Sequence, residues 1–214
     1  MCGKFTAQAS WRRVVEFSQP LTESPDDQIV TYRPMSMLPV IFFDKEAGTR
    51  RIVAMRWGFP HRSNPNRPEP IHVRSETIDE KPTFRDAFLN GQRGIVVMQT
   101  FNEGKVLPNG KTEQWTVDPG DGVPRGFAFL WRRFEIAGQP APLLACVMAT
   151  VPPSNLIAQI TDRMPAILEA GDWATWLGEN NASPAAAKAV LKTMEGVRWQ
   201  MAPEPRKPPP PRRR

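Results

Sequence analysis

The strongest constraint on the fold is a series of four short runs, rich in β-branched and aromatic residues, in the middle of the chain. Turn-forming segments rich in glycine or proline separate these runs, such as the PGDG sequence at Pro119–Gly122. Short strands joined by such turns favour antiparallel pairing. The predicted strands are Gly94–Thr100, Glu113–Val117, Gly126–Phe134 and Leu143–Thr150.

Helical patterns lie before and after this central region. Ser10 can cap a helix that runs to about Phe17, and Pro82 and Gly91 bracket a helix over Thr83–Leu89. The other predicted elements are strands at Val40–Phe43 and Arg51–Trp57, an exposed basic loop at Pro60–Pro70, and helices at Ser154–Ile160, Asp172–Leu177 and Ser183–Met194. Together they predict an α+β fold with a mostly antiparallel β-sheet or barrel core and short peripheral helices.

The chain has 214 residues with 40% apolar content, enough to bury one substantial core. No linker-like segment divides it, so we predict a single domain over residues 1–202. Residues 203–214 are rich in proline and arginine and cannot bury apolar area. We therefore expect a disordered tail, in part polyproline II.

The formal charge of +6 suggests an anionic partner, and its distribution along the chain is uneven. The last twelve residues carry five basic side chains against Glu204, which leaves +2 for the rest of the chain. Within the predicted domain, the stretch from Arg50 to Arg74 holds six arginines against the single acid Glu69. If the folded part binds nucleic acid, this stretch supplies the charge.

The two cysteines, Cys2 and Cys146, are far apart and form no CxxC or Cys/His cluster. We therefore expect no metal, no cofactor and no disulfide, and a location in a reducing cytoplasm. The N-terminal sequence has no apolar leader, and no run approaches the length of a membrane span. We expect a monomer without membrane association.

Cys2 carries the most distinctive chemistry in the sequence. Removal of Met1 would place an α-amine and a thiol on one residue, a 1,2-aminothiol. The α-amine has a reference pKa of about 7.7 to 8.0, so its neutral form can condense with an aldehyde at neutral pH. The thiol can then close a five-membered thiazolidine. Taken alone, however, Cys2 also fits an ordinary cysteine at a frayed terminus.

Several motifs occur in an order that resembles one family. They are MCGK at the N-terminus, the Trp57-Gly58 pair, IHVRSET at Ile71–Thr77, RGIVVMQTFNEGK at Arg93–Lys105 and ITDRMPAIL at Ile160–Leu168. They are similar to the MCGR, WG, NAR-x-ET, G-F-x-E-W and IHDRMP signatures of the SOS-response-associated peptidase family. The resemblance covers most of residues 1–200, and several ordered motifs are more specific than any single one.

The resemblance implies a protein that binds single-stranded DNA at abasic sites and forms a thiazolidine crosslink there, nucleoid-associated when bound. It implies a peptidase- or lyase-like abasic-site enzyme with Cys2 as the covalent nucleophile and Glu103 as the general acid/base. The family name also implies a peptidase activity connected with release of Met1. Without the resemblance, Glu103 fits an acid that caps a turn in TFNEGK. The residues implied at the DNA-binding surface are Lys4, Arg56, Trp57, Gly58, Arg74, Glu76, Arg163 and Pro165.

Two departures from the family pattern bear on catalysis. His72 stands where the family has asparagine, and Thr161 stands where it has histidine. One hypothesis is that His72 replaces the lost imidazole, since histidine titrates near pH 6.5. The alternative is a non-covalent single-stranded DNA-binding module with a degenerate site. A third candidate is an N-terminal-nucleophile hydrolase, and Cys2 is the one sequence feature that favours it.

Overall fold

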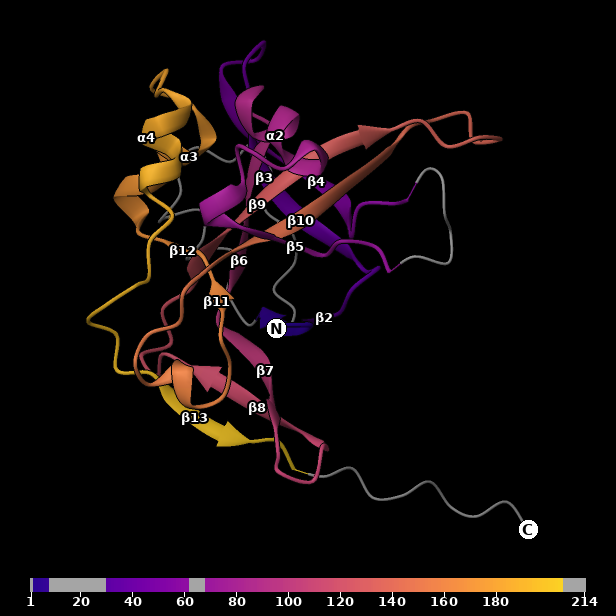
Figure 1. Cartoon of the computed structure of the whole chain (residues 1–214). Coiled ribbons are helices and arrows are strands. Elements are labelled where there is room, and N and C mark those ends of the chain that lie inside the picture. The colour runs from indigo at the N-terminus through magenta and orange to yellow at the C-terminus, as the bar shows by residue number, and fades with distance from the viewer. Residues whose placement is uncertain (1, 8–29, 62–67, 206–214) are drawn as a thin grey trace.

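The computed structural model describes residues 2–7, 30–61 and 68–205. The predicted helix from Ser10 to Phe17 and the tail from residue 206 onward lie outside the described residues. The described part is mostly β-structure with a few short helices (Figure 1). This confirms the predicted fold class.

Five strands close into a barrel because each one pairs with two others. They are β3 (Met37–Asp44), β4 (Thr49–Trp57), β6 (Arg93–Met98), β9 (Arg125–Phe134) and β10 (Leu143–Val151). The order around the barrel is β10-β4-β3-β6-β9 and back to β10. Only the contact between β4 and β10 is parallel in this ring, so the prediction of a mostly antiparallel core is confirmed.

A second sheet lies beside the barrel, and its strand order is β13-β8-β7-β1-β2. Its strand β7 follows β6 after the single residue Gln99, so one passage of the chain links the barrel to this sheet. The strands of this sheet are β1 (Lys4–Ala7), β2 (Val30–Tyr32), β7 (Thr100–Val106), β8 (Thr112–Asp118) and β13 (Gln200–Pro203). The last strand reaches one residue past the predicted end of the domain.

Three very short strands attach sequence motifs to the barrel. β5 (His72–Arg74) runs parallel to β10, and β11 (Met164–Pro165) pairs antiparallel with β10. β12 (Ile167–Leu168) pairs with β9. The IHVRSET and ITDRMPAIL segments therefore meet along β10, although they are far apart in the sequence.

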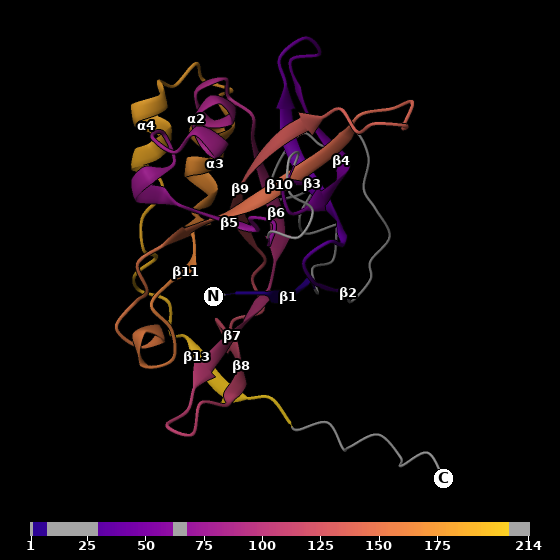
Figure 2. The same ribbon diagram turned by 45° about the vertical axis from the view of Figure 1, so that its right-hand side comes forward.

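The three α-helices in the described part of the chain lie together along one side of the barrel (Figure 2). They are α2 (Pro82–Leu89), α3 (Trp173–Leu177) and α4 (Pro184–Ala189), and single 3-10 turns form η1 (Ser75–Thr77), η2 (Ile157–Gln159) and η3 (Ala170–Asp172).

Two predicted helices are shorter in the structure. The helix predicted over Ser154–Ile160 contains only the turn η2. Ser183 caps α4 as predicted, but the helix ends at Ala189 and not at Met194. Beyond it, the Thr193 hydroxyl donates to the main-chain oxygen of Pro152 at 2.8 Å, so a tertiary contact replaces the helical pattern.

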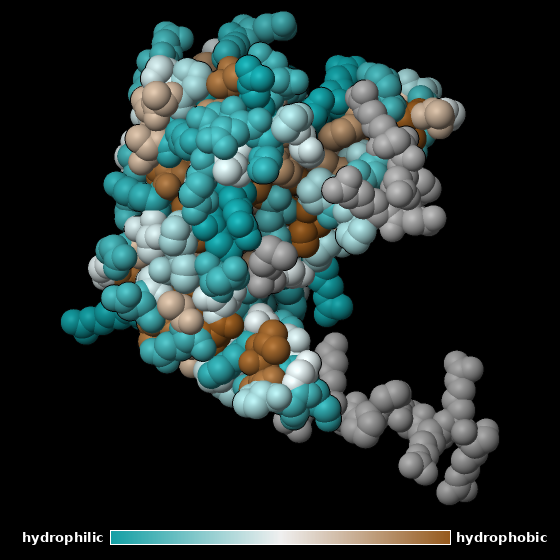
Figure 3. Space-filling view, viewed as in Figure 1, coloured by the Kyte–Doolittle hydropathy of each residue, from teal (hydrophilic) through white to brown (hydrophobic). Residues whose placement is uncertain are grey.

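The surface seen in Figure 3 is mainly hydrophilic, with hydrophobic residues scattered among polar ones. Ile95 and Val147 of the barrel strands are fully buried, whereas Met37 at the start of β3 is 49% exposed. Among the described residues, no helix combines the length and hydrophobicity that crossing a bilayer requires.

Candidate active site

Cys2 lies two residues before β1, which pairs with the strand that carries Glu103. β1 pairs antiparallel with β7, with Lys4 opposite Asn102 and Phe5 opposite Phe101. Cys2 is only 1% exposed, and its thiol donates to the main-chain oxygen of Lys4 at 3.3 Å. The pairing of β1 with β7 thus brings the N-terminal cysteine and the predicted acid/base together.

Burial and, to a smaller extent, the charge of Glu103 raise the pKa of the Cys2 thiol to about 12. Main-chain groups of Lys4 and Asn102 hydrogen-bond the thiol and act in the opposite direction. Burial is the larger effect, so the sulfur carries its proton at neutral pH. Any reaction that makes this sulfur a nucleophile needs a base nearby.

Glu103 is 1% exposed and lies within β7, not in a turn as its polar neighbours suggest. Desolvation raises the pKa of its carboxyl group, and the nearby Asp162 raises it too. A hydrogen bond with the Thr161 side chain lowers this pKa. A buried carboxyl group with a raised pKa beside a thiol can exchange protons with it.

Thr161 therefore contacts the predicted acid/base directly. It follows η2, where its main-chain N–H donates to Ile157 at 3.1 Å. The threonine hydroxyl can hydrogen-bond the Glu103 carboxylate, but it has no titratable group near neutral pH. It can stabilise the charged form of Glu103 without serving as a second acid or base.

His72 meets Cys2 from the barrel side, where β5 lies on β10. Its Nε2 atom lies 2.5 Å from the main-chain oxygen of Cys2. A carbonyl oxygen only accepts, so Nε2 carries the proton and donates. Desolvation lowers the pKa of His72 to about 4, so the ring is neutral at pH 7. Its ring also packs edge-on against Trp57, with centroids 6.2 Å apart.

Trp57 and Gly58 belong to the interior, not to a surface that could contact DNA. Trp57 is fully buried, and its indole donates to Ile71 at 2.9 Å, so it offers no face on which a base could stack. Gly58 is buried with a φ of +127°, which favours glycine. Arg56 donates to the Gly58 oxygen at 2.9 Å and forms an ion pair with Glu69 at 2.7 Å.

Contacts of Arg163 and Pro165 join two motifs, although the Glu76 side chain that pairs with Arg163 is itself 48% exposed. Arg163 is 8% exposed and makes a bidentate pair with Glu76, with N–O distances of 2.5 and 2.8 Å. It also donates to the Thr150 oxygen at 2.6 Å, and Pro165 pairs with Thr150 in the β10–β11 ladder. This geometry suits a support for the site better than a direct phosphate contact. Arg74, by contrast, is exposed at the end of β5.

Two further residues near the site were not predicted. Asn102, next to Glu103, is 3% exposed, and its side-chain amide donates to Glu204 at 2.6 Å. The Glu204 carboxylate also pairs with Lys4 at 2.5 Å. Asn102 lies in the motif that contains Glu103, which could have drawn attention to it, but no sequence signal linked Glu204 to the N-terminus.

Within the described residues, no group of three or more histidine, cysteine, aspartate or glutamate side chains is arranged to hold a metal ion.

Relatives of the chain occur in Bacillus subtilis. It is 28% identical to abasic site processing protein YobE over 207 residues, which cover 89% of this chain and 88% of YobE. It is 26% identical to abasic site processing protein YoaM over 195 residues, covering 89% of this chain and 85% of YoaM.

The fold matches two crystal structures of bacterial proteins. A protein from Bordetella bronchiseptica gives a TM-score of 0.76 at 22% identity, covering 95% of this chain and 100% of that one. A protein from Bacteroides thetaiotaomicron gives 0.75 at 17% identity, covering 94% and 91%.

The family model described as SOS response associated peptidase (SRAP) matches residues 1–205, which is nearly the whole chain. The chain therefore belongs to the SOS response associated peptidase family.

Proposed function

We propose that this protein processes abasic sites in single-stranded DNA by forming a covalent thiazolidine through Cys2. The observation that carries the proposal is the meeting of three groups at the start of β1: Cys2, the buried Glu103 and the His72 imidazole. The names of the Bacillus relatives support abasic-site processing as the reaction class.

The crosslink forms in three steps: release of Met1, imine formation and ring closure. Water hydrolyses the peptide bond between Met1 and Cys2, which releases methionine and frees the α-amine. The amine attacks the C1′ aldehyde of the ring-opened abasic sugar, and one water leaves to give an imine. The thiol then adds to the imine carbon, and its proton ends on the ring nitrogen. The product is a five-membered thiazolidine that joins the protein to the DNA.

Glu103 moves the protons in this scheme. The protonated carboxylic acid donates to the hydroxyl that leaves as water, and the carboxylate then accepts the thiol proton during ring closure. Burial raises the pKa of Glu103, which favours the protonated form that the first proton transfer requires. Ring closure needs such a base because the pKa of the Cys2 thiol is about 12.

His72 acts as a positioning residue for Cys2 and not as a second acid/base. Its pKa of about 4 keeps the ring neutral at neutral pH, and its Nε2–H holds the Cys2 carbonyl. A fixed carbonyl limits the rotation of the attached α-carbon and so orients the amine and thiol. Thr161 then supports Glu103 in place of the family's histidine.

The DNA strand needs no base-specific contact, since the base is missing at the lesion. Arg74 is exposed and lies two residues after His72 in β5, so a phosphate near the site could reach its side chain. Arg163 contributes indirectly by fixing Glu76 to the barrel. Contacts of this kind position the strand without reading its sequence.

A second candidate is a binding module without covalent chemistry. The observation in its favour is that Thr161 places no imidazole beside Glu103. Such a protein would bind single-stranded DNA with the same basic side chains, but its complex would dissociate on denaturation.

Incubation with an oligonucleotide that carries one abasic site, followed by denaturing electrophoresis, separates the two candidates. The proposal predicts a denaturation-resistant band for the wild type and none for Cys2→Ala. Binding in native conditions with no band in the denaturing gel would support the module instead. An oligonucleotide without the lesion serves as the matched substrate control.

A further inference from the structure

The C-terminal end of the described chain contacts both strands that carry the active site. Glu204 directly follows β13, and its main-chain N–H donates to Gln114 at 2.7 Å. One oxygen of its carboxylate accepts from Lys4 Nζ at 2.5 Å and from Asn102 Nδ2 at 2.6 Å. Lys4 is two residues from Cys2, and Asn102 precedes Glu103 in β7, so Glu204 contacts the two strands of the site on the face of β7 opposite the one that Glu103 uses.

We propose that Lys4 and Asn102 form a binding subsite for a DNA phosphate, and that Glu204 occupies this subsite when DNA is absent. The inference rests on the proposed function, because it assumes single-stranded DNA as the ligand. It adds to that function a competition between the chain's own carboxylate and the phosphate.

The chemistry of the two donors fits an anionic oxygen. An ammonium and a side-chain amide converge on a single carboxylate oxygen. Lys4 and Asn102 are directly opposite each other in the β1–β7 ladder, so their side chains share one face of the sheet. A phosphate oxygen can accept from both groups as the carboxylate oxygen does.

Replacement of the Glu204 carboxylate by another anion is more favourable than its departure alone, because the Asn102 amide needs a second acceptor. Asn102 is 3% exposed, and its Nδ2 also donates to the Thr116 hydroxyl at 2.9 Å. If Glu204 left without replacement, the second amide hydrogen would lose its partner in a buried position, which is unfavourable. A phosphate that takes the place of the carboxylate keeps this hydrogen bond.

Glu204 is attached in a way that permits its release. The side chains of Lys4 and Glu204 are 28% and 25% exposed, and ion pairs with such access to water stabilise little and weaken in salt. Glu204 lies between Pro203 and Pro205, which have no N–H to donate. β13 is an edge strand that pairs only with β8 within the described sheet.

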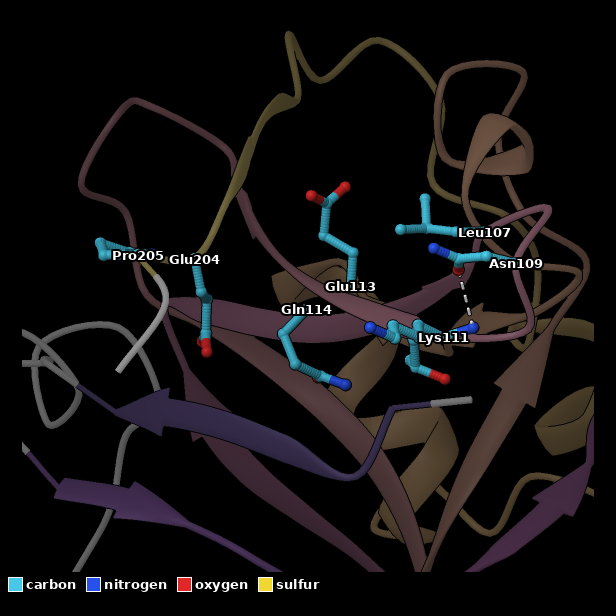
Figure 4. A pocket seen from close by; sticks show the side chains of 8 residues that line it. Leu107, Asn109, Lys111, Glu113, Gln114, Glu204 and Pro205 are labelled. Carbon is cyan, nitrogen blue, oxygen red and sulfur yellow. Dashed lines mark hydrogen bonds between the residues drawn. The ribbon is translucent and has the colours of Figure 1, made fainter. Parts of the chain in front are cut away.

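A groove beside this contact offers space for the strand. Its volume is about 690 Å³, and its lining includes Leu107, Asn109, Lys111, Gln114, Glu204 and Pro205. Figure 4 shows Glu204 on one side of the groove and Lys111 on the other. Lys111 is exposed and supplies a positive charge across the groove from Glu204, while Glu113, which also lines the groove, carries a negative charge.

The experiment measures the affinity for single-stranded DNA without an abasic site, by fluorescence anisotropy at low and high salt. The variants are Glu204→Gln, Lys4→Met and the double variant. Glu195→Gln is the matched control, because Glu195 is exposed, lies outside this groove and loses the same charge.

We expect Glu204→Gln to bind about fivefold more tightly than the wild type at low salt, with the difference shrinking at high salt. In the Lys4→Met background, the same change has no further effect, because the competition requires the ammonium. Glu195→Gln stays within about twofold of the wild type, as expected for a distant, screened charge.

Unchanged or weaker binding by Glu204→Gln would overturn the inference and assign Glu204 to holding β1 in place. Equal tightening by Glu195→Gln, or tightening that persists in Lys4→Met, would overturn it as well. Crosslinking of the wild type to abasic DNA is measured separately. Its failure would reject the proposed function, whereas the affinities test the role of Glu204 in either case.

Discussion

The Nε2 atom of His72 lies 2.5 Å from the main-chain oxygen of Cys2, although the two residues are 70 positions apart in the chain. The contact ties the N-terminus to the barrel strand β5. It reaches the backbone of Cys2 and not its thiol, so His72 acts on the position of the reactive groups. It stands where the family pattern has asparagine.

Substituting His72 by alanine should slow crosslinking by about tenfold or less, because one hydrogen bond to the Cys2 carbonyl is lost. The shape of the pH profile between pH 6 and 8 should not change, since the wild-type pKa of about 4 keeps His72 neutral throughout this range. Single-turnover rates on abasic single-stranded DNA measure both quantities.

His72→Asn is the informative partner variant, because its amide can donate a hydrogen bond but cannot titrate. It should recover part of the lost rate. A wild-type transition near pH 6.5 that disappears in both variants would instead identify His72 as an acid/base and contradict the positioning role.

Removing the hydroxyl of Thr161 should shift the titration of Glu103. The hydrogen bond with Thr161 lowers the pKa of Glu103, so Thr161→Val should raise it further. The part of the pH–rate profile that depends on Glu103 should move to higher pH. Thr161→Ser keeps the hydroxyl and should stay close to the wild type. Identical profiles for valine and serine would show that the contact does not tune Glu103.

Glu103→Gln keeps the size of the side chain but removes its acid/base function. We expect the crosslinking rate to fall by about 100-fold or more. Affinity for undamaged single-stranded DNA should remain unchanged, because Glu103 is 1% exposed. An equal loss of affinity and rate would point to misfolding, which circular dichroism would reveal.

Low pH should weaken the ion pair between Glu76 in η1 and Arg163, the residue just before β11. The hydrogen bond with Arg163 lowers the pKa of Glu76 to about 2 from an ordinary 4.5. The ion pair therefore stabilises the fold fully above about pH 4.5, and this contribution is lost as the pH falls towards 2. Urea unfolding at pH 5 and pH 3 should show a smaller loss for Glu76→Gln than for the wild type.

Glu80→Gln provides the control for that experiment, because Glu80 is exposed on the same segment. Its loss of stability between the two pH values should match that of the wild type. If Glu76→Gln also lost as much stability as the wild type, the ion pair would not be the source of the acid sensitivity.

Much of the barrel could be predicted, because its strands are apolar on the faces that pack together. The run Gly126–Phe134 became β9 with one extra residue, and Leu143–Thr150 became β10 with one extra residue. β1, β2 and β13 have three or four residues each and were not predicted. Such short strands form through pairing with neighbours, which a local pattern does not contain.

The strand that carries Glu103 could not be predicted from its local sequence either. β7 runs through Asn102, Glu103 and Gly104, whose residue types favour a turn. In the structure Glu103 occupies a buried position that a core residue would otherwise fill. Family motifs identified Cys2 and Glu103, but only the fold shows that Thr161 contacts Glu103 and that Trp57 is buried in the core.

The most direct test of covalent chemistry at Cys2 is the intact mass of the protein before and after reaction with abasic single-stranded DNA. The account predicts a free protein without Met1 and an adduct equal to protein plus oligonucleotide less one water. The mass of the adduct should not change with borohydride, because a thiazolidine resists reduction. Retention of Met1 with no adduct, or an adduct that gains two hydrogens with borohydride, would contradict it.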